Sequence, residues 1–402
     1  MDEYAGRLNN FYNTIGLKRL IFPPKLFYGP DALSFLIDQI PASGAIVIAD
    51  SFLINNETFA SIRKKIDANV FYIYNEPRYS DIDAILSKTD RNKPPSAIVA
   101  IGGGSTIDTA KAVKAFYIYG KYQRIGYEDR NISTVMDAKT LPLIAVPTTP
   151  ASGSECSRYY LIFDHDGNKT VSRSWNLIPD YSVLVPDFLK NYPAKAAVLS
   201  AFDAFTHMYE TLICRNESSP ITNEFSYIGI NAVIGAMHQI DKDRPEILPG
   251  ELIEKLQLSA AIGGLVLSNI RTGMIHHAAE QMSSQVKLSH TMSLIVFCDT
   301  VMSFYSAPCA DKYKKMIGRI REEGTNTISD IQDIIDLWNR LFDHYGISEE
   351  LRKKMSAVKI DIKTLTEKVF SDRTWVEKES PVPLSFADVS SIVSSSVGRY
   401  KK

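Results

Sequence analysis

Length, composition and charge limit what kind of protein this chain can be. It has 402 residues, enough for two or three domains, and its 45 Lys plus Arg nearly balance 46 Asp plus Glu to leave a net charge of −1. This balance argues against a dedicated nucleic-acid-binding protein and against an acidic disordered chain, whereas 45% hydrophobic and 23% charged residues are typical of globular proteins.

The cysteines and the first residues carry no sign of export. Four cysteines without a CxxC pair are no disulfide framework, and the segment MDEYAGRLNNFYNTIG lacks a basic start followed by an apolar run. No stretch approaches the roughly 18 uninterrupted apolar residues of a membrane-spanning helix. We therefore expect a cytoplasmic protein with free thiols and with no membrane or nucleic-acid partner.

The first half of the chain alternates between strand-like and helical segments. Residues 1–20 have no clear period and are expected to form an extension. Short apolar runs of strand character follow at Ala45–Ala49, Val70–Tyr74, Ala97–Ile101 and Leu143–Val146. Segments of helical length, such as Asp31–Gln39 and Asp81–Lys88, lie between them. This alternation predicts βαβ units and a mostly parallel sheet.

The second half is dominated by long segments with a period of about 3.6 residues. Examples are Ala194–Ile213, Ser226–Gln239 and Leu252–Ser268, and no convincing strand follows Pro193. The chain is therefore expected to form an α/β domain over residues 21–192 and an all-α domain over residues 193–402.

A glycine-rich turn follows the third predicted strand in AIVAIGGGSTIDTAK, residues 97–111. Gly102, Gly103 and Gly104 permit close approach of a ligand to the backbone, and the N-terminus of the next helix favours a phosphate. Ser105 and Asp108 follow on that helix. The motif is not the GxGxxG fingerprint, and the alternative interpretation is a tight βα turn without a ligand.

A second polar loop, PTTPASGSE at residues 147–155, follows the fourth predicted strand. Thr148, Thr149 and Ser152 supply hydroxyls at the carboxyl edge of the sheet, where ligands of open α/β sheets bind. Asp50 ends an earlier strand, and an acidic group there suits a ribose 2′-hydroxyl and so favours NAD over NADP. Its alternative role is to cap a helix.

A group of possible metal ligands lies in the helical half. Asp203 and His207 are four residues apart, which places both on one face of a helix, and His276, His277 and His290 follow. Imidazoles with one carboxylate suit Fe²⁺ or Zn²⁺. Only one of the adjacent His276 and His277 is expected to face the ion. Each histidine, taken alone, is also explained as a hydrogen-bonded structural residue.

Taken together, these segments resemble the iron-containing, metal-dependent (group III) alcohol dehydrogenases. The resemblance runs from Phe22 to Val397 and rests on FYGPDAL, GGGSTIDTAK, PTTPASGSE, DAFTHMYE and the stretch His276–His290. It implies a dehydroquinate synthase-like fold with two domains. The N-terminal domain would be Rossmann-like α/β and bind NAD(P), with NADP less expected than NAD. The C-terminal domain would be helical and bind the metal.

The resemblance also implies the site residues. The implied metal ligands are Asp203, His207, His276 and His290, with Fe²⁺ expected and Zn²⁺ or Ni²⁺ able to fit the same site. The implied cofactor-binding residues are Asp50, Gly102, Gly103, Gly104, Ser105, Asp108, Thr148, Thr149 and Ser152. Homodimers are common among such proteins, so a homodimer is expected.

Some positions depart from the family pattern and indicate a divergent member. Many members carry HxxxH where this chain has His276 and Glu280, and the usual Pro-His-Gly around the last ligand is Ser289-His290-Thr291. Glu280 and His277 are the candidate catalytic residues. Glu280 could take part in proton transfer, and His277 falls beside a metal ligand.

The sequence predicts an NAD(H)-linked alcohol dehydrogenase or aldehyde reductase that transfers a hydride to or from a small substrate. Arg271 precedes the metal segment, and an arginine there favours an aldehyde that carries a phosphonate or carboxylate. Arg271 is otherwise explained as a helix-end residue. Two other functions stay open: a sugar-phosphate cyclase-type lyase of the same fold, and a non-catalytic binding protein derived from it.

Overall fold

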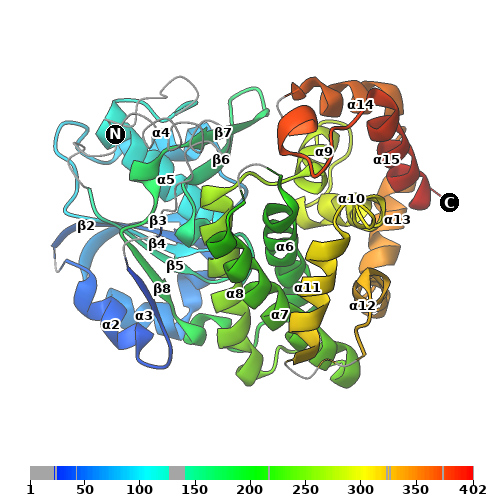
Figure 1. Cartoon of the computed structure of the whole chain (residues 1–402). Coiled ribbons are helices and arrows are strands. Elements are labelled where there is room, and N and C mark those ends of the chain that lie inside the picture. Colours follow the sequence, from blue (N-terminus) through cyan, green and yellow to red (C-terminus); the bar gives the residue numbers. More distant parts are fainter. Residues whose placement is uncertain are drawn as a thin grey trace, which may run out of the picture. The chain divides into compact units, whose positions relative to one another are not determined.

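The computed structural model describes residues 22, 25–41, 43–125, 141–215, 218–322, 325, 327–373 and 375–401 (Figure 1). The extension predicted over residues 1–20 lies outside the described residues. Contacts divide the rest into two compact units that interleave along the chain. We call Phe22–Ala204 with Ala236–Ser268 the α/β unit, and Phe205–Gly235 with Asn269–Lys402 the helical unit. The predicted boundary at residues 192 and 193 stays a prediction.

The α/β unit is built on a parallel six-stranded sheet, as predicted. Its strand order is β1-β8-β5-β4-β2-β3, and every neighbouring pair is parallel. The strands are β1 Leu26–Tyr28, β2 Ser43–Asp50, β3 Asp67–Ile73, β4 Ile98–Gly102, β5 Leu143–Pro147 and β8 Tyr181–Leu184. The sequence predicted β2 to β5 but not β1 and β8, whose three and four residues are too short to show a period.

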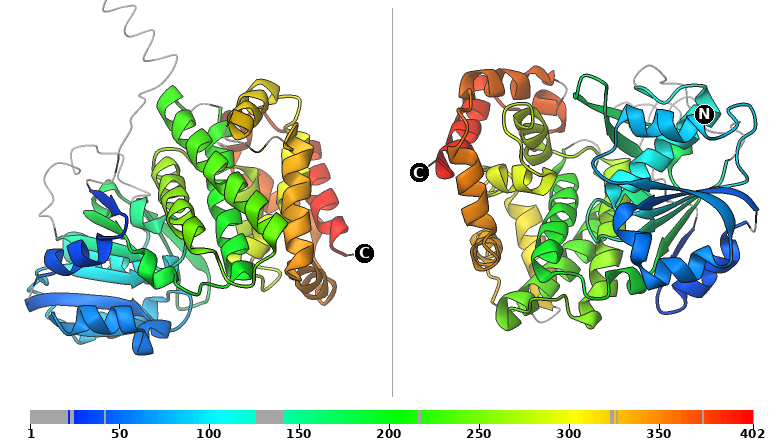
Figure 2. Two further views of the ribbon diagram at one scale, coloured as in Figure 1. Left: turned by 90° about the horizontal axis from the view of Figure 1, so that it is seen from below. Right: turned by 180° about the vertical axis from the view of Figure 1, so that it is seen from behind.

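Helices cover both faces of this sheet (Figures 1 and 2). Ile46 and Ile48 of β2 pack in one core with α4 Tyr79–Ser87 and α5 Gly104–Tyr119. Val47 and Ala49 pack in a second core with α2 Ala32–Gln39 and α3 Glu57–Arg63. Because successive side chains alternate between two buried faces, the central strands read as continuous apolar runs.

Two strands that the sequence did not reveal form an antiparallel hairpin. β6 Tyr159–Phe163 pairs with β7 Lys169–Arg173, outside the main sheet. The 3-10 turns η3 Ser154–Cys156 and η4 Trp175–Leu177 flank the hairpin, whereas η1 Ser51–Asn55 follows β2 and η5 Pro186–Leu189 follows β8. In β6, Tyr160 is buried and its hydroxyl donates to the Tyr122 carbonyl, so the hairpin is held to the α/β core.

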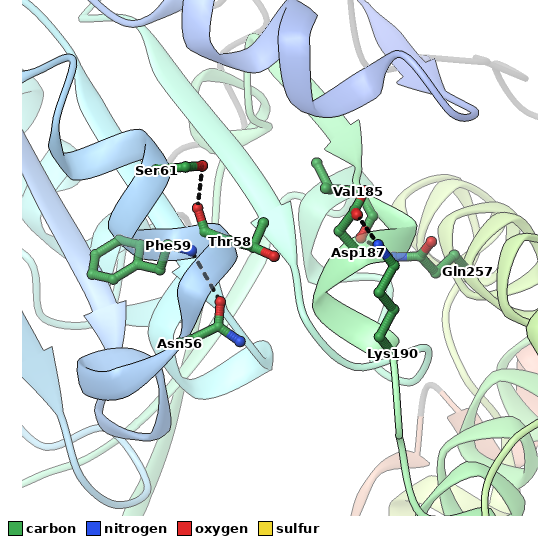
Figure 3. Close-up of polar contacts among 8 residues, drawn as sticks. All are labelled: Asn56, Thr58, Phe59, Ser61, Val185, Asp187, Lys190 and Gln257. Atoms are coloured by element: carbon green, nitrogen blue, oxygen red, sulfur yellow. Dashed lines mark hydrogen bonds and ion pairs between the residues drawn. The ribbon is translucent and has the colours of Figure 1, made fainter.

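Polar contacts in the α/β unit cap helix α3 and join helix α8 to the segment after β8 (Figure 3). The Asn56 side chain caps α3 by accepting from the Phe59 N–H at 2.9 Å. On helix α8, Gly250–Asn269, the Gln257 amide donates to the Val185 carbonyl at 3.4 Å, just after β8. Helix α8 therefore groups with the sheet, although it lies far beyond it in the sequence.

Among the described residues, the remaining regular secondary structure is helical. They are α6 Ala194–Ile213, α7 Pro220–Asp243, α9 Met274–Met282, α10 His290–Phe304, α11 Ala310–Glu322, α12 Ile331–His344, α13 Ile347–Ser356, α14 Ile362–Ser371 and α15 Phe386–Arg399, with a π-helical turn, η6, at Trp375–Glu379. Among the described residues after 193 there is no strand, only an isolated bridge between Pro193 and Ile247. The predicted helical second half is therefore confirmed.

The four cysteines are free, as the sequence predicted, and all four are buried. In the described part of the chain, no single helix has the length and hydropathy needed to cross a membrane. The consecutive helices α8 and α9, bent by 91° at their junction, together reach the length and hydropathy of a membrane span, by length and composition only.

Candidate functional site

The glycine turn between β4 and α5 leaves no room for side chains. A Cβ on Gly102 would lie 2.4 Å from Oγ1 of Thr106, and a Cβ on Gly104 would lie 2.8 Å from Oγ of Ser152. Gly103 precedes α5 in extended conformation, and its carbonyl accepts the first helical hydrogen bonds. The turn therefore presents bare backbone at the positive end of a 16-residue helix, which suits a phosphate.

The second predicted loop lies directly beside this turn. Strands β4 and β5 are parallel neighbours, with Gly102 opposite Pro147, and the Thr148 N–H donates to the Gly102 carbonyl at 3.1 Å. The side chain of Thr149 lies 3.4 Å from the position of a Cβ on Gly103. The structure thus brings the glycines and the hydroxyl-rich loop together at the carboxyl edge of the sheet.

Asp50 ends β2, the strand on the other side of β4. Its carboxylate accepts a hydrogen bond from the Phe52 N–H at 3.2 Å and so caps η1. Burial raises the pKa of Asp50, against the lowering effect of its backbone hydrogen bonds. The capping role is therefore present, and contact with a ribose stays a prediction.

Asp108 joins α5 to the segment that follows the second loop. One carboxylate oxygen accepts from the Ser154 hydroxyl at 2.6 Å, and the other accepts from the Leu161 N–H at 2.9 Å. Burial raises the pKa of Asp108, although Lys111 opposes this shift. Both oxygens thus hold the protein together, so direct contact between Asp108 and the cofactor stays a prediction.

Lys111, one turn further along α5, is a buried cation that the sequence did not single out. Its ammonium donates to the hydroxyls of Ser154 and Ser157 at 2.8 and 3.1 Å and to the Tyr159 carbonyl at 2.7 Å. Burial lowers its pKa to about 8, whereas burial raises the pKa of neighbouring Glu155 to about 7. Lys111 and Asp108 share Ser154 and fix the second loop to the glycine-turn helix.

Helix α8 supports the same loop through a contact between two glycines. A Cβ on Gly264 would lie 1.9 Å from the Gly153 carbonyl oxygen, and Gly153 itself has φ +61°. Further along α8, the Ser268 hydroxyl accepts from the Arg158 N–H at 2.8 Å and donates to the Cys156 carbonyl at 3.2 Å. The loop therefore lies backbone to backbone on α8, and only glycine fits either position.

Four predicted metal ligands converge. Asp203 and His207 lie on α6, His276 lies on α9, and His290 is the first residue of α10. One ligand atom from each lies within 4.8 Å of all the others, and three of the residues are buried. The rings of His207 and His276 stack with centroids 4.6 Å apart, and His290 lies 5.3 Å from His276. One carboxylate and three imidazoles form a donor set that fits Fe²⁺ or Zn²⁺.

Glu210 is a residue of this centre that sequence reasoning missed. Its buried carboxylate lies 2.6 Å from Nδ1 of His276. The signal was in the spacing, because Glu210 follows Asp203 by seven residues and His207 by three on one helix face. The Glu210 contact itself depends on the packing of α9 against α6, because Glu210 and His276 are 66 residues apart in sequence, and a local motif does not show it.

The candidate catalytic residues on α9 are outside the group of converging ligands. Nε2 of His277 lies 3.0 Å from the Val369 carbonyl, and its ring lies 6.0 Å from that of Trp375. Of the two adjacent histidines, His276 thus belongs to the metal group and His277 contacts α14 and η6. Glu280 is half-buried, one helical turn after His276. The catalytic roles of His277 and Glu280 stay predictions.

Arg271 lies in the link between α8 and α9, two residues before Gly273, which precedes the first residue of α9. It is half-buried. A contact with substrate stays a prediction for this residue.

Two adjacent loops at the carboxyl edge of a parallel sheet, and a carboxylate–histidine cluster that could hold a metal ion, fit the class of metal-dependent, nicotinamide-linked oxidoreductases. The family model for iron-containing alcohol dehydrogenases matches residues 23–186, and the model for the C-terminal part of that family matches residues 197–397. The chain belongs to the iron-containing alcohol dehydrogenase family. It is an oxidoreductase with the fold that its sequence predicted.

Individual relatives agree with this assignment. The chain is 26% identical over 371 residues to the probable alcohol dehydrogenase EutG of Escherichia coli K12, covering 87% of this chain and 89% of that protein. It superposes on the iron-containing alcohol dehydrogenase of Thermococcus thioreducens with a TM-score of 0.76, at 22% identity and over 94% of this chain and 100% of the other. It superposes on the sulfoacetaldehyde reductase of Bifidobacterium kashiwanohense, solved with NAD⁺, with a TM-score of 0.76. That match has 17% identity and covers 95% of this chain and 99% of the other.

Proposed function

We propose that this protein is a metal-dependent, NAD(H)-linked alcohol dehydrogenase or aldehyde reductase that acts on a small substrate. The observation that carries the proposal is the convergence of Asp203, His207, His276 and His290 within 4.8 Å. A divalent ion bound there supplies Lewis-acid stabilisation to the oxygen of the alcohol or aldehyde, so the reaction needs no activated protein nucleophile. Fe²⁺ is the expected ion, and Zn²⁺ or Ni²⁺ fits the same donors.

The chain's own part in cofactor binding follows from the two loops. Gly102, Gly103, Gly104 and Ser105 would hold the pyrophosphate on backbone N–H groups at the start of α5. Thr148, Thr149 and Ser152 would donate hydroxyl hydrogen bonds from the adjacent loop, and Asp50 would accept from a ribose hydroxyl. An acidic residue at that strand end repels a 2′-phosphate, which supports NAD rather than NADP.

Proton transfer is assigned to α9. Glu280 follows His276 by four residues and so shares its helix face, which supports a role in carrying the hydroxyl proton to or from solvent. His277, the neighbour of His276 in sequence, is proposed as the second catalytic residue, and its contacts with the Val369 carbonyl and Trp375 would hold its ring in place.

The proposed substrate carries an anionic group. Arg271 precedes α9 by a short link, and guanidinium pairs well with carboxylate, phosphonate or sulfonate oxygens. The name of the structural neighbour from Bifidobacterium, a sulfoacetaldehyde reductase, supports a small anionic aldehyde. A cytoplasmic location is proposed as well, since the free cysteines suit a reducing compartment. A homodimer is also proposed, because homodimers are common in the family.

A panel of aldehydes and alcohols, followed by NADH absorbance after loading with Fe²⁺ or Zn²⁺, tests the function. We expect stoichiometric NADH consumption with at least one small aldehyde and little rate without metal. A cyclase would instead recycle NAD with no net change in absorbance. Metal-loaded protein that consumes no NADH with any aldehyde, and produces none with any alcohol, would contradict the proposal.

A further inference from the structure

A buried glutamate on α6 holds one of the proposed metal ligands. The Glu210 carboxylate is fully shielded from solvent, and Oε2 lies 2.6 Å from Nδ1 of His276, whose side chain is 5% exposed. Glu210 is not among the four residues whose atoms converge as ligands. It contacts the centre through one of them.

The same carboxylate receives the start of helix α9. It accepts hydrogen bonds from the backbone N–H of Ile275 and, at 3.4 Å, from that of His276. At the start of this helix, a Cβ on Gly273 would lie 2.9 Å from the carboxylate, so glycine leaves the space that Glu210 occupies. A carboxylate at a helix N-terminus is favoured by the helix dipole as well as by these hydrogen bonds.

These contacts fix which nitrogen of His276 carries the proton. Backbone N–H groups can only donate, so the Glu210 oxygens act as acceptors toward α9. An ionised carboxylate has no hydrogen to donate, so with Glu210 ionised its Oε2, 2.6 Å from Nδ1, accepts and Nδ1 of His276 carries the hydrogen. The lone pair of His276 then belongs to Nε2, the nitrogen on the other side of the ring.

We infer that Glu210 is a positioning residue of the metal centre: it holds His276 in the Nδ1–H tautomer, orients the ring and strengthens Nε2 as a donor. The inference rests on the proposed function, because it assumes that the four converging residues bind a divalent ion. Such outer carboxylates typically change metal affinity by about 10- to 100-fold when they are mutated.

A purely structural role, joining α6 to α9, is the competing explanation. Glu210→Gln retains the volume but directs an amide N–H₂ toward groups that themselves donate, so it weakens the hold on His276. Asp299→Asn is the matched control. Asp299, nine residues after His290 on α10, is a partly buried carboxylate that accepts from Asn339 at 3.0 Å and pairs with Arg399.

The test is Co²⁺ titration of the full-length metal-free proteins, read by d–d absorbance and by competition with a chelator, with thermal unfolding in parallel. We expect Glu210→Gln to weaken Co²⁺ binding about 10- to 100-fold and to shift the d–d bands. We expect Asp299→Asn to retain wild-type affinity and spectrum at a similar loss of thermal stability.

Unchanged Co²⁺ affinity and spectrum in Glu210→Gln would overturn the inference, and so would an equal loss of affinity in both variants. Failure of the wild type to bind Co²⁺ would instead overturn the proposed metal centre. If Glu210→Gln does not fold, ¹⁵N shifts of labelled histidine in the metal-free wild type decide, with His276→Asn for assignment. An Nδ1–H tautomer supports the inference, and an Nε2–H tautomer contradicts it.

Discussion

At the scale of a single side chain, the proposed role of Arg271 in substrate choice can be tested by mutation. If it binds the anionic group of the substrate, Arg271→Met should lower kcat/KM for a carboxylate- or phosphonate-bearing aldehyde about 10- to 100-fold, since a hydrogen-bonded charge contributes about 1.5–3 kcal/mol. The rate with a neutral aldehyde of similar size should change little. Arg271→Lys, which retains the charge, should recover part of the loss. If Arg271→Met leaves the ratio of kcat/KM for anionic and neutral aldehydes unchanged, the proposal of an anionic substrate is wrong.

Single residues also mark the limit of sequence reasoning. The sequence predicted four metal ligands, Asp203, His207, His276 and His290. It did so because a carboxylate and a histidine at helical spacing, followed by two histidines fourteen residues apart, resemble a known family. Glu210 was missed because its contact with His276 forms only when α9 packs on α6. Asp108 was predicted as a cofactor-binding residue and stays so, and the sequence did not show that its two oxygens accept from Ser154 and Leu161.

At the scale of elements, helix α8 supports the second loop of the proposed nucleotide site, and a substitution at Gly264 tests this support. A methyl group there would overlap the Gly153 carbonyl, so Gly264→Ala must displace the loop that carries Thr148, Thr149 and Ser152. We expect a loss of about 1–3 kcal/mol in the free energy of unfolding and a higher KM for NADH. Thermal unfolding and initial-rate kinetics measure the two effects.

Gly235→Ala on α7 is the control for this prediction. Nothing lies within 4 Å of a Cβ at Gly235, so alanine should be neutral or stabilising by about 0.5–1 kcal/mol through helix propensity. A Gly264→Ala protein with wild-type stability and KM would show that the loop does not depend on the close contact with α8.

Element length explains which secondary structure could be predicted. Helix α6 was predicted at Ala194–Ile213, its observed bounds, because 20 residues show a clear period. The five-residue strands of the hairpin were missed. In β6, buried and half-buried side chains alternate, with Tyr160 facing the core. The sequence alone does not show this alternation, because nearly all residues of β6 are apolar or aromatic.

At the scale of the whole molecule, the chain is organised by contacts rather than by sequence order. Helix α8 groups with the sheet through Gly264, Gln257 and Ser268, although β8 ends at Leu184, 66 residues before α8 begins at Gly250. The assignment of a helix to one unit or the other cannot be predicted from hydrophobic periodicity, because periodicity shows only which face of each helix is apolar. The sequence could therefore predict the class of each half, but not that the two compact units interleave.

The central claim is that one divalent ion is held by Asp203, His207, His276 and His290, and metal analysis of purified protein tests it most directly. We predict about one ion per chain in the wild type and in His165→Ala, whose imidazole is exposed far from these ligands in sequence. We predict loss of both metal and NADH-linked activity in His290→Ala. A His290→Ala protein with full metal content and full activity would contradict the account.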